Sequence, residues 1–342
     1  MTPLPEDGHT SGTYVEDKYQ RRAMEQLFDQ KIEATTRSYA ISIEHVTKSY
    51  GAAAAVDDLS FEVTPGRVTG FLGPNGAGKS TTMKILLGLA SPTSGRATIG
   101  GVAYGELPDP TGTVGASVES DAFHPGRSGR NHLRILADAT DTPLERVDEV
   151  LELVDLSAAA NRHAGAYSLG MKQRLGLAAA LLCDPPVLVL DEPGNGLDPQ
   201  GIRTLRNLLR SRAAEGNTVF VSSHLLGEVE QLADDVVVVN QGRLVTRGSL
   251  SELRQSASLV RAASPKALQV ALEGAGGIVE NGRPNTLVVR GLSLDEIGEH
   301  AFRAGIALHE LSQYADSLED RFFAWTGEAA DGGTQSNTKE EL

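Results

Sequence analysis

The residue pattern most able to do chemistry is the glycine-rich stretch 73–81, which reads G-P-N-G-A-G-K-S-T. Glycines let the backbone curve around a phosphate, so that successive N–H groups and the N-terminus of the following helix point at the anion. Lys79 is placed to reach the β- and γ-phosphates of a nucleotide, and the Ser80 hydroxyl to ligate Mg²⁺. The expected nucleotide-binding residues of this phosphate loop are Gly73, Pro74, Asn75, Gly76, Ala77, Gly78, Lys79, Ser80 and Thr81.

Two acids follow an apolar run further along the chain, in V-L-V-L-D-E at 187–192. A parallel strand that is buried on both faces needs such a run, and ligands of an α/β sheet bind at the carboxyl ends of its strands. We therefore expect Asp191 to hold Mg²⁺ through water and Glu192 to polarise the water that attacks the nucleotide. His224 stands at the end of another apolar run, T-V-F-V-S-S, from which it could contact the γ-phosphate and orient the water.

The elements that must position these residues are readable from periodicity. Alternating strands begin near Ala40, the run 68–72 feeds the phosphate loop, and 80–89 has helical spacing. The period becomes helical again from Asn131 to about Ala160, which predicts an inserted helical subdomain. The segment V-V-V-V-N-Q-G-R-L-V-T-R-G predicts a hairpin near residue 250. The fold class that follows is α/β, a P-loop NTPase domain with a helical subdomain.

A second unit is predicted beyond residue 250. Strand-like and helix-like segments follow one another there in the order βαββαβ, which favours a small ferredoxin-like α+β domain. A last helix at 317–325 places Leu318, Phe322 and Trp325 at helical spacing, as packing residues or as a dimer contact. The predicted division is a polar, partly disordered extension at 1–38, the nucleotide-binding domain at 39–250, the accessory domain at 251–327 and a disordered tail at 328–342.

Composition narrows the partners and the location. The chain has 342 residues, a formal net charge of −14 and a pI near 5.1, so no nucleic-acid partner is expected. No run of 18 apolar residues is present, and the N-terminus lacks the pattern of a signal peptide, which favours the cytoplasm. The single cysteine, Cys183, lies in an apolar run and is expected in the core.

The residues between these motifs resemble a known family over about 40–250. The segment Y-S-L-G-M-K-Q-R-L-G-L-A at 167–178 is similar to the signature motif of the ATP-binding subunits of ABC transporters. The resemblance implies that Ser168 and Gly170 touch the γ-phosphate across a dimer interface and that Tyr50 stacks on adenine. It makes Asp198, in G-L-D-P, the D-loop residue and His224 the switch histidine. The signature positions are Ser168, Leu169, Gly170, Met171 and Lys172.

Two departures from the family pattern stand out. The signature reads S-L-G-M-K where S-G-G-Q is commonest, and Glu119 replaces the Q-loop glutamine at the end of V-G-A-S-V. A carboxylate at Glu119 could still contact Mg²⁺, with a full charge in place of an amide dipole. Glutamate at this position and G-N-G-L-D-P are similar to the bacitracin-resistance and lantibiotic-immunity branch, and the C-terminal appendage is similar to drug-exporting subfamilies.

The resemblance implies an ATPase that needs ATP and Mg²⁺, works as a homodimer or heterodimer and drives a separate transmembrane permease from the cytoplasmic side of the membrane. Its cargo is expected to be a drug, a peptide antibiotic or another amphipathic compound that is exported. The alternative is a soluble ABC-type ATPase that acts mechanically on ribosomes or DNA, against which stand the single phosphate loop and the lack of long heptads or a basic arm. A GTPase switch lacks its N-K-x-D string here.

Overall fold

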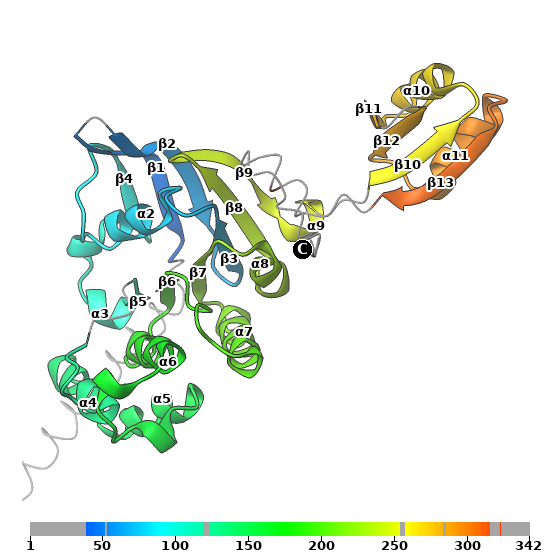
Figure 1. The fold of residues 1–342 in the computed structure, drawn as a ribbon. Helices are drawn as coiled ribbons and strands as arrows, with labels where there is room; N and C mark the ends of the chain where they lie inside the picture. Colours follow the sequence, from blue (N-terminus) through cyan, green and yellow to red (C-terminus); the bar gives the residue numbers. More distant parts are fainter. Residues whose placement is uncertain are drawn as a thin grey trace, which may run out of the picture.

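The computed structural model describes residues 39–51, 53–118, 123–253, 257–282, 285–314 and 322. Within these ranges the chain builds three β-sheets with helices around them (Figure 1). The extension expected at 1–38 and the tail expected at 328–342 lie outside the described residues, and the domain boundaries drawn from the sequence stay a prediction.

A six-stranded sheet carries the phosphate loop. Its strands lie in the order β5-β6-β7-β3-β8-β9, with β5 to β8 parallel to one another and β9 antiparallel to β8. Because β3 stands inside this order, the loop that follows it meets the ends of both β7 and β8. The strands are β3 (Val68–Leu72), β5 (Val114–Ser117), β6 (Val187–Leu190), β7 (Thr218–Ser223), β8 (Asp235–Asn240) and β9 (Arg243–Ser249).

A three-stranded antiparallel sheet, in the order β2-β1-β4, packs beside the six-stranded sheet. Its strands are β1 (Ile41–Tyr50), β2 (Ala53–Val63) and β4 (Ser94–Ile99). Three fully buried rings, Phe61 of β2, Phe71 of β3 and Phe220 of β7, have centroids 5.2–5.8 Å apart. These tilted aromatic contacts join the two sheets directly beneath the phosphate loop.

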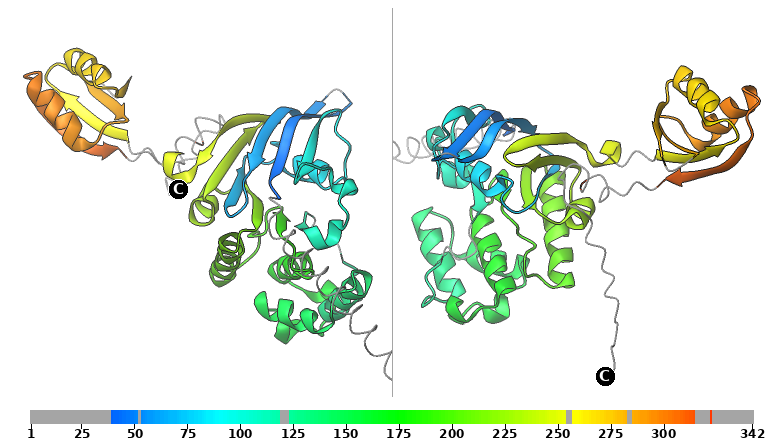
Figure 2. Two further views of the ribbon diagram at one scale, coloured as in Figure 1. Left: turned by 180° about the vertical axis from the view of Figure 1, so that it is seen from behind. Right: turned by 45° about the horizontal axis from the view of Figure 1, so that its top comes forward.

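Helices cover the sheets and form a group of their own. The helix after the phosphate loop, α2 (Lys79–Leu86), lies against the sheets, whereas α4 (Gly129–Ala139), α5 (Glu145–Leu153) and α6 (Leu169–Ala180) pack together around one apolar cluster (Figures 1 and 2). The helical subdomain expected after Asn131 is thus two helices, α4 and α5, packed on α6. Further helices are α3 (Pro110–Thr113), α7 (Pro199–Ala214), α8 (Leu226–Leu232), α9 (Leu250–Leu253) and three short 3₁₀ turns, η1 (Tyr104–Glu106), η2 (Ser157–Ala159) and η3 (Ala164–Ala166).

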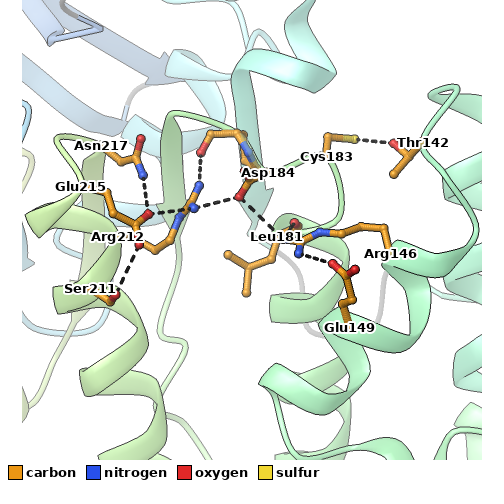
Figure 3. Close-up of polar contacts among 11 residues, drawn as sticks. Thr142, Arg146, Glu149, Leu181, Cys183, Asp184, Ser211, Arg212, Glu215 and Asn217 are labelled. Atoms are coloured by element: carbon orange, nitrogen blue, oxygen red, sulfur yellow. Dashed lines mark hydrogen bonds and ion pairs between the residues drawn. The ribbon is translucent and has the colours of Figure 1, made fainter. Parts of the chain in front are cut away.

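An ion-pair bridge, Arg146–Asp184–Arg212, ties α5 to α7 (Figure 3). Asp184 Oδ1 lies 2.8 Å from Arg212 Nη1 and 3.6 Å from Arg146 Nη2. Arg212 also donates to the Pro185 carbonyl at 2.9 Å. Cys183 lies beside the bridge, with Sγ 3.5 Å from Thr142 Oγ1, and is half-buried. The expectation of a core cysteine is wrong, because the apolar run that contains Cys183 ends at a surface turn.

The small C-terminal sheet has the predicted βαββαβ order. Its strands are β10 (Ala257–Ala262), β11 (Ile278–Asn281), β12 (Thr286–Arg290) and β13 (Leu308–Tyr314), with helices α10 (Pro265–Gly274) and α11 (Leu294–Arg303). All pairings are antiparallel, in the spatial order β11-β12-β10-β13. One apolar cluster between sheet and helices includes Val260, Leu272 and Ile297, so the unit has its own core (yellow and orange in Figure 1). The ferredoxin-like part of the predicted fold is confirmed.

Phe322 returns the chain to the first unit. Its side chain is 5% exposed and packs in one cluster with Leu72, Val229, Val238 and Leu250. The packing role expected for Phe322 is therefore confirmed, whereas Leu318 and Trp325 lie outside the described residues. Among the described residues, no helix is long and apolar enough to cross a membrane.

Candidate nucleotide-binding site

The phosphate loop follows β3 and ends where α2 begins. Gly76 and Gly78 have φ angles of 81° and 99°, which favour glycine over any residue with a side chain. Space is restricted as well, because a Cβ on Gly73 would lie 2.4 Å from the Val239 carbonyl oxygen, and one on Gly78 would lie 2.4 Å from that of Ala55. The glycine spacing found in the sequence is thus required by the backbone, and the loop opens onto the N-terminus of α2.

Lys79 lies folded into this loop. Its side chain is 6% exposed, and Nζ donates to the carbonyls of Gly73 at 2.6 Å and Pro74 at 3.2 Å. An ammonium that is this deeply buried needs partners of opposite polarity. The loop carbonyls supply them in this structure, and the same ammonium is available to a phosphate that enters the loop.

Three further side chains meet at the neighbouring strand ends. Glu192 Oε1 lies 3.5 Å from Lys79 Nζ, and Glu192 Oε2 lies 2.7 Å from His224 Nδ1. Asp191 and Glu192 follow β6, while His224 follows β7, which lies between β6 and β3. The parallel order of β6, β7 and β3 therefore brings Lys79, Glu192 and His224 into one row at the carboxyl ends of these strands.

Ser222 joins this row and was not singled out by the sequence. It is the penultimate residue of β7 and has 0% exposure. Its hydroxyl accepts a hydrogen bond from the Glu192 N–H at 2.9 Å and donates one to Asp191 Oδ1. Only the pairing of β6 with β7 reveals this contact, since the sequence of a buried strand does not show which of two adjacent serines faces its neighbour.

Mg²⁺ fits the oxygen donors of this site. Ser80 is exposed at the second residue of α2, and Asp191 is half-buried with one carboxylate oxygen held by Ser222. Within the described ranges no group of three His, Cys, Asp or Glu residues could hold a metal. Mg²⁺ in nucleotide sites is bound by one or two protein oxygens together with phosphates and water, so a hydroxyl and a carboxylate suit it.

Tyr50 is placed as an open aromatic surface. It is the last residue of β1 and 58% exposed, and Lys48 Nζ lies 4.9 Å from its ring centroid. A lysine beside an aromatic face contributes a cation–π contact, which leaves the other face of the ring accessible for stacking on a base. The adenine-stacking role stays a prediction.

The signature residues begin α6, away from α2. The Ser168 hydroxyl caps α6 by accepting from the Met171 N–H at 3.3 Å. Gly170 lies so close to the chain at Gly196 that an added Cβ would stand 2.6 Å from the Gly196 carbonyl oxygen. In Figure 1 α6 stands among the helices α4 and α5, whereas α2 lies against the sheets. Ser168 is not among the residues that contact Lys79 or Glu192 within the described part of this chain.

Two other residues of the signature segment, Leu169 and Lys172, have separate surroundings. Leu169 is 50% exposed, and Lys172 Nζ lies 5.9 Å from the Phe123 ring centroid, a contact that the sequence did not predict. Asp198, the predicted D-loop residue, caps α7 by accepting from the Gly201 N–H at 2.9 Å and pairs with Arg174 at 3.4 Å.

A groove of about 600 Å³ lies between α2, β5 and the helices α4 and α6. Burial lowers the pKa of His132 in this groove, with the positive charge of Arg127 adding to the effect, and burial raises the pKa of Tyr104. Both changes favour uncharged rings near neutral pH, so the groove presents an aromatic wall. Glu119 lies outside the described residues, just beyond β5. The residues that line the groove include Lys84, Leu87, Tyr104, Ser117, Phe123, His132 and Leu136.

Comparison with known proteins decides the family. A family model described as ABC transporter matches residues 56–195, and a domain of unknown function matches 256–319. The bacitracin transport ATP-binding protein BcrA of Enterococcus faecalis is 42% identical over 220 residues, which is 64% of this chain and 71% of that protein. The uncharacterized ABC transporter ATP-binding protein YhcH of Bacillus subtilis is 36% identical over 313 residues, 88% of this chain and 98% of that protein.

This chain belongs to the ATP-binding subunits of the ABC transporter family. The resemblance read from the signature segment is thereby confirmed, together with the P-loop NTPase fold. A solved dimer of the ATP-binding cassette MJ0796, bound to ADP and Pi after hydrolysis, has the same fold, with a TM-score of 0.55, 22% identity and coverage of 61% of this chain and 98% of that one. As an ABC ATP-binding subunit the chain is an ATPase.

Proposed function

We propose that this ABC ATP-binding subunit supplies the energy for a separate transmembrane permease that exports a drug, a peptide antibiotic or another amphipathic compound. The support is the identity of 42% to a bacitracin transport ATP-binding protein over 220 residues, which is 64% of this chain. The subunit itself then works at the cytoplasmic side of the membrane as a peripheral protein. The observation that carries the catalytic part of the proposal is the row Lys79–Glu192–His224 beside the phosphate loop.

ATP binding begins with an exchange of partners at Lys79. A bound triphosphate offers Lys79 Nζ a charged acceptor in place of the carbonyls of Gly73 and Pro74 and of the Glu192 carboxylate. The loop N–H groups and the N-terminus of α2 hold the phosphates, and Tyr50 stacks on the adenine. Ser80 and Asp191 would hold Mg²⁺, which when bound would neutralise phosphate charge.

Release from Lys79 leaves Glu192 with His224 as its remaining partner in this row, with Glu192 Oε2 2.7 Å from His224 Nδ1. Glu192 then accepts a proton from the attacking water, while His224 orients the carboxylate and contacts the γ-phosphate. Because Glu192 is paired with Lys79 in this structure, a phosphate that competes for Lys79 would free the Glu192 carboxylate to act as the base.

The second half of each site is supplied by another subunit. Ser168 and Gly170 begin α6, while Lys79 begins α2, so we place the signature residues on the ATP held by a partner copy or a homologous chain. The MJ0796 cassette, which has this fold, is dimeric, and this supports the pairing of two subunits. Because two ATP molecules bridge the subunits, occupancy shifts the equilibrium toward the closed dimer, and loss of the γ-phosphate reopens it.

The permease is proposed to dock in the groove between α2, α4 and α6. The groove is hollow, partly apolar and free of charge at His132 near neutral pH, which suits a short helix with an apolar face. It also touches both the helix that follows the phosphate loop and the helix that follows the signature. Movement of one against the other would therefore be felt by the docked partner.

The Glu192→Gln variant tests the assignment of the base, through its ATP binding and its ATP turnover. This change keeps the size of the side chain and removes the base, so ATP binding is expected to persist while turnover falls roughly 10²- to 10⁴-fold. Turnover close to that of the wild type would contradict the assignment of the base.

The same variant, tagged and purified with ATP from gently solubilised cells of its source, tests the partner. A polytopic membrane protein in stoichiometric amount is the expected result. Ribosomal proteins or DNA in its place would overturn the transporter proposal and favour a soluble regulator.

A further inference from the structure

We infer that Ser222 is a positioning residue of ATP hydrolysis, which sets the carboxylate of Asp191 and the backbone of Glu192 at the same time. This inference rests on the proposed roles of those two acids. It starts from a hydroxyl with 0% exposure that lies between the two residues at the end of β6. The family resemblance assigns no role to this position.

Sheet order explains why Ser222 can do this. β7 lies between β6, which ends in the acids, and β3, which feeds the phosphate loop. Leu190 pairs with Val221 on one side, and Phe71 pairs with Ser222 on the other. A side chain at the carboxyl end of β7 therefore stands level with the first residues after β6, one strand away from the phosphate loop.

The Ser222 hydroxyl takes part in two hydrogen bonds, one as donor and one as acceptor. Ser222 Oγ has one proton, which it donates to Asp191 Oδ1, and it accepts the Glu192 N–H at 2.9 Å. Since the proton can go to only one acceptor, the orientation of the hydroxyl is fixed. Asp191 is held from its backbone as well, because its N–H donates to the Ser117 carbonyl at 2.8 Å. One carboxylate oxygen of Asp191 is thus engaged, and the other is left for a water ligand of Mg²⁺.

The backbone of Glu192 requires such support. Its φ is 50°, in the left-handed region that residues other than glycine rarely adopt and that persists where the surroundings enforce it. The bond from the Glu192 N–H to Ser222 Oγ acts at that residue. It therefore helps to direct the Glu192 side chain toward the row formed with Lys79 and His224.

The neighbouring serine has a different task, which makes the assignment specific. Ser223 Oγ donates to Glu228 Oε2 at 3.0 Å and accepts from the Leu225 N–H at 3.0 Å, so it organises the turn into α8. Adjacent residues of a strand point to opposite faces of the sheet, and only Ser222 contacts the acids. The two serines before His224 thus have separate roles: Ser222 contacts Asp191 and Glu192, and Ser223 organises the turn into α8.

The experiment compares Ser222→Ala with Thr218→Val in the full-length protein. Thr218 is the first residue of β7, also has 0% exposure, and donates one hydrogen bond, to the Tyr39 carbonyl at 2.8 Å. Each variant therefore loses one buried hydroxyl from the same strand, at opposite ends. The melting temperature of each variant is measured and turnover is compared at a temperature where both are folded, so that a difference in turnover reports position and not stability.

Two readouts define the expected result. For Ser222→Ala, kcat for ATP falls roughly tenfold or more while KM changes less than about threefold, because Lys79 and the loop still bind the phosphates. The affinity for a fluorescent ATP analogue is then measured with Mg²⁺ and with a chelator. The gain in affinity that Mg²⁺ provides shrinks on the order of tenfold, whereas the metal-free affinity is unchanged. Thr218→Val changes neither readout.

Several outcomes overturn the inference. Turnover of Ser222→Ala within twofold of the wild type, together with an unchanged gain from Mg²⁺, removes the positioning role. An equal loss of turnover in Thr218→Val assigns the effect to the strand as a whole. The Glu192→Gln variant, run in parallel, separates this inference from the proposed function. If Glu192→Gln is inactive and Ser222→Ala is fully active, only the inference fails; if Glu192→Gln stays active, the assignment of the base fails first.

Discussion

The six-stranded sheet of the nucleotide-binding unit is mainly parallel, whereas the four-stranded sheet of the C-terminal unit is antiparallel. In the first, β6, β7 and β3 are parallel and end at one edge, where Lys79, Asp191, Glu192 and His224 gather. In the second every pairing is antiparallel, so consecutive strand ends alternate between the two edges. Direction thus decides where polar residues can be collected, and the difference localises the chemistry in the first unit.

The most severe test of this difference removes Lys79. Lys79→Ala deletes a buried ammonium that is proposed to pass from the loop carbonyls to a phosphate, so ATP affinity should fall on the order of a hundredfold or more. Titration calorimetry with ATP measures the effect. The matched change in the C-terminal unit is Lys266→Ala on the exposed face of α10, which should leave the affinity unchanged. Equal affinity in the wild type and Lys79→Ala would break the comparison.

A core truncation in the C-terminal unit tests whether that unit is independent. Ile297 of α11 is fully buried in the cluster with Val260 and Leu272, so Ile297→Ala should destabilise this unit by about 2–5 kcal/mol. Differential scanning calorimetry should show one shifted transition, while ATP turnover stays within twofold of the wild type. A parallel loss of turnover would show that the small unit supports the catalytic one.

A smaller effect is expected at the ion-pair bridge. Asp184→Asn removes the charge that holds Arg146 and Arg212 together, across α5 and α7. Because Asp184 is 63% exposed, we expect a loss of about 0.5–1 kcal/mol in the free energy of unfolding, reduced further in high salt. Urea denaturation at low and high NaCl measures it. The within-helix pair Glu299–Arg303 of α11 is the control, since Glu299→Gln should cost less.

The smallest effect concerns acid sensitivity in the C-terminal unit. Hydrogen bonds from the Ser293 N–H and hydroxyl hold the pKa of Glu296 below its ordinary value of 4.5. A depressed pKa in the folded state stabilises the fold above pH 4.5, and this contribution is lost as the pH falls through the lower folded value. Thermal melts between pH 3 and 7, a range of about four units around this pKa, should show a flatter acid limb for Glu296→Gln. An unchanged limb would show that the hydrogen bonds from Ser293 to Glu296 do not contribute to acid stability.

Much of the nucleotide-binding unit could be predicted because its signals are local. Glycine spacing at 73–78 reports φ angles and close backbone contacts at those same positions, and the apolar run before Asp191 reports a strand that is buried on both faces. The βαββαβ order was readable for the same reason, since each element shows its own period.

The features that escaped prediction are non-local. Ser222 contacts Asp191 and Glu192 because β7 pairs with β6, and the sequence does not show that these two strands are neighbours. Cys183 looked like a core residue because its run is apolar, yet the turn after α6 places it beside Asp184 at the surface. The contact of Lys172 with Phe123 joins two segments about 50 residues apart.

Phe322 gives the C-terminal unit a second point of attachment. The chain leaves the nucleotide-binding unit after Leu250 and, 72 residues later, places Phe322 in the same apolar cluster as Leu250. The C-terminal unit is therefore held to the nucleotide-binding unit at both of its ends. Closing the chain segment in this way restricts the positions that the C-terminal unit can take. Loss of the Phe322 contact would remove this restriction without altering the unit itself.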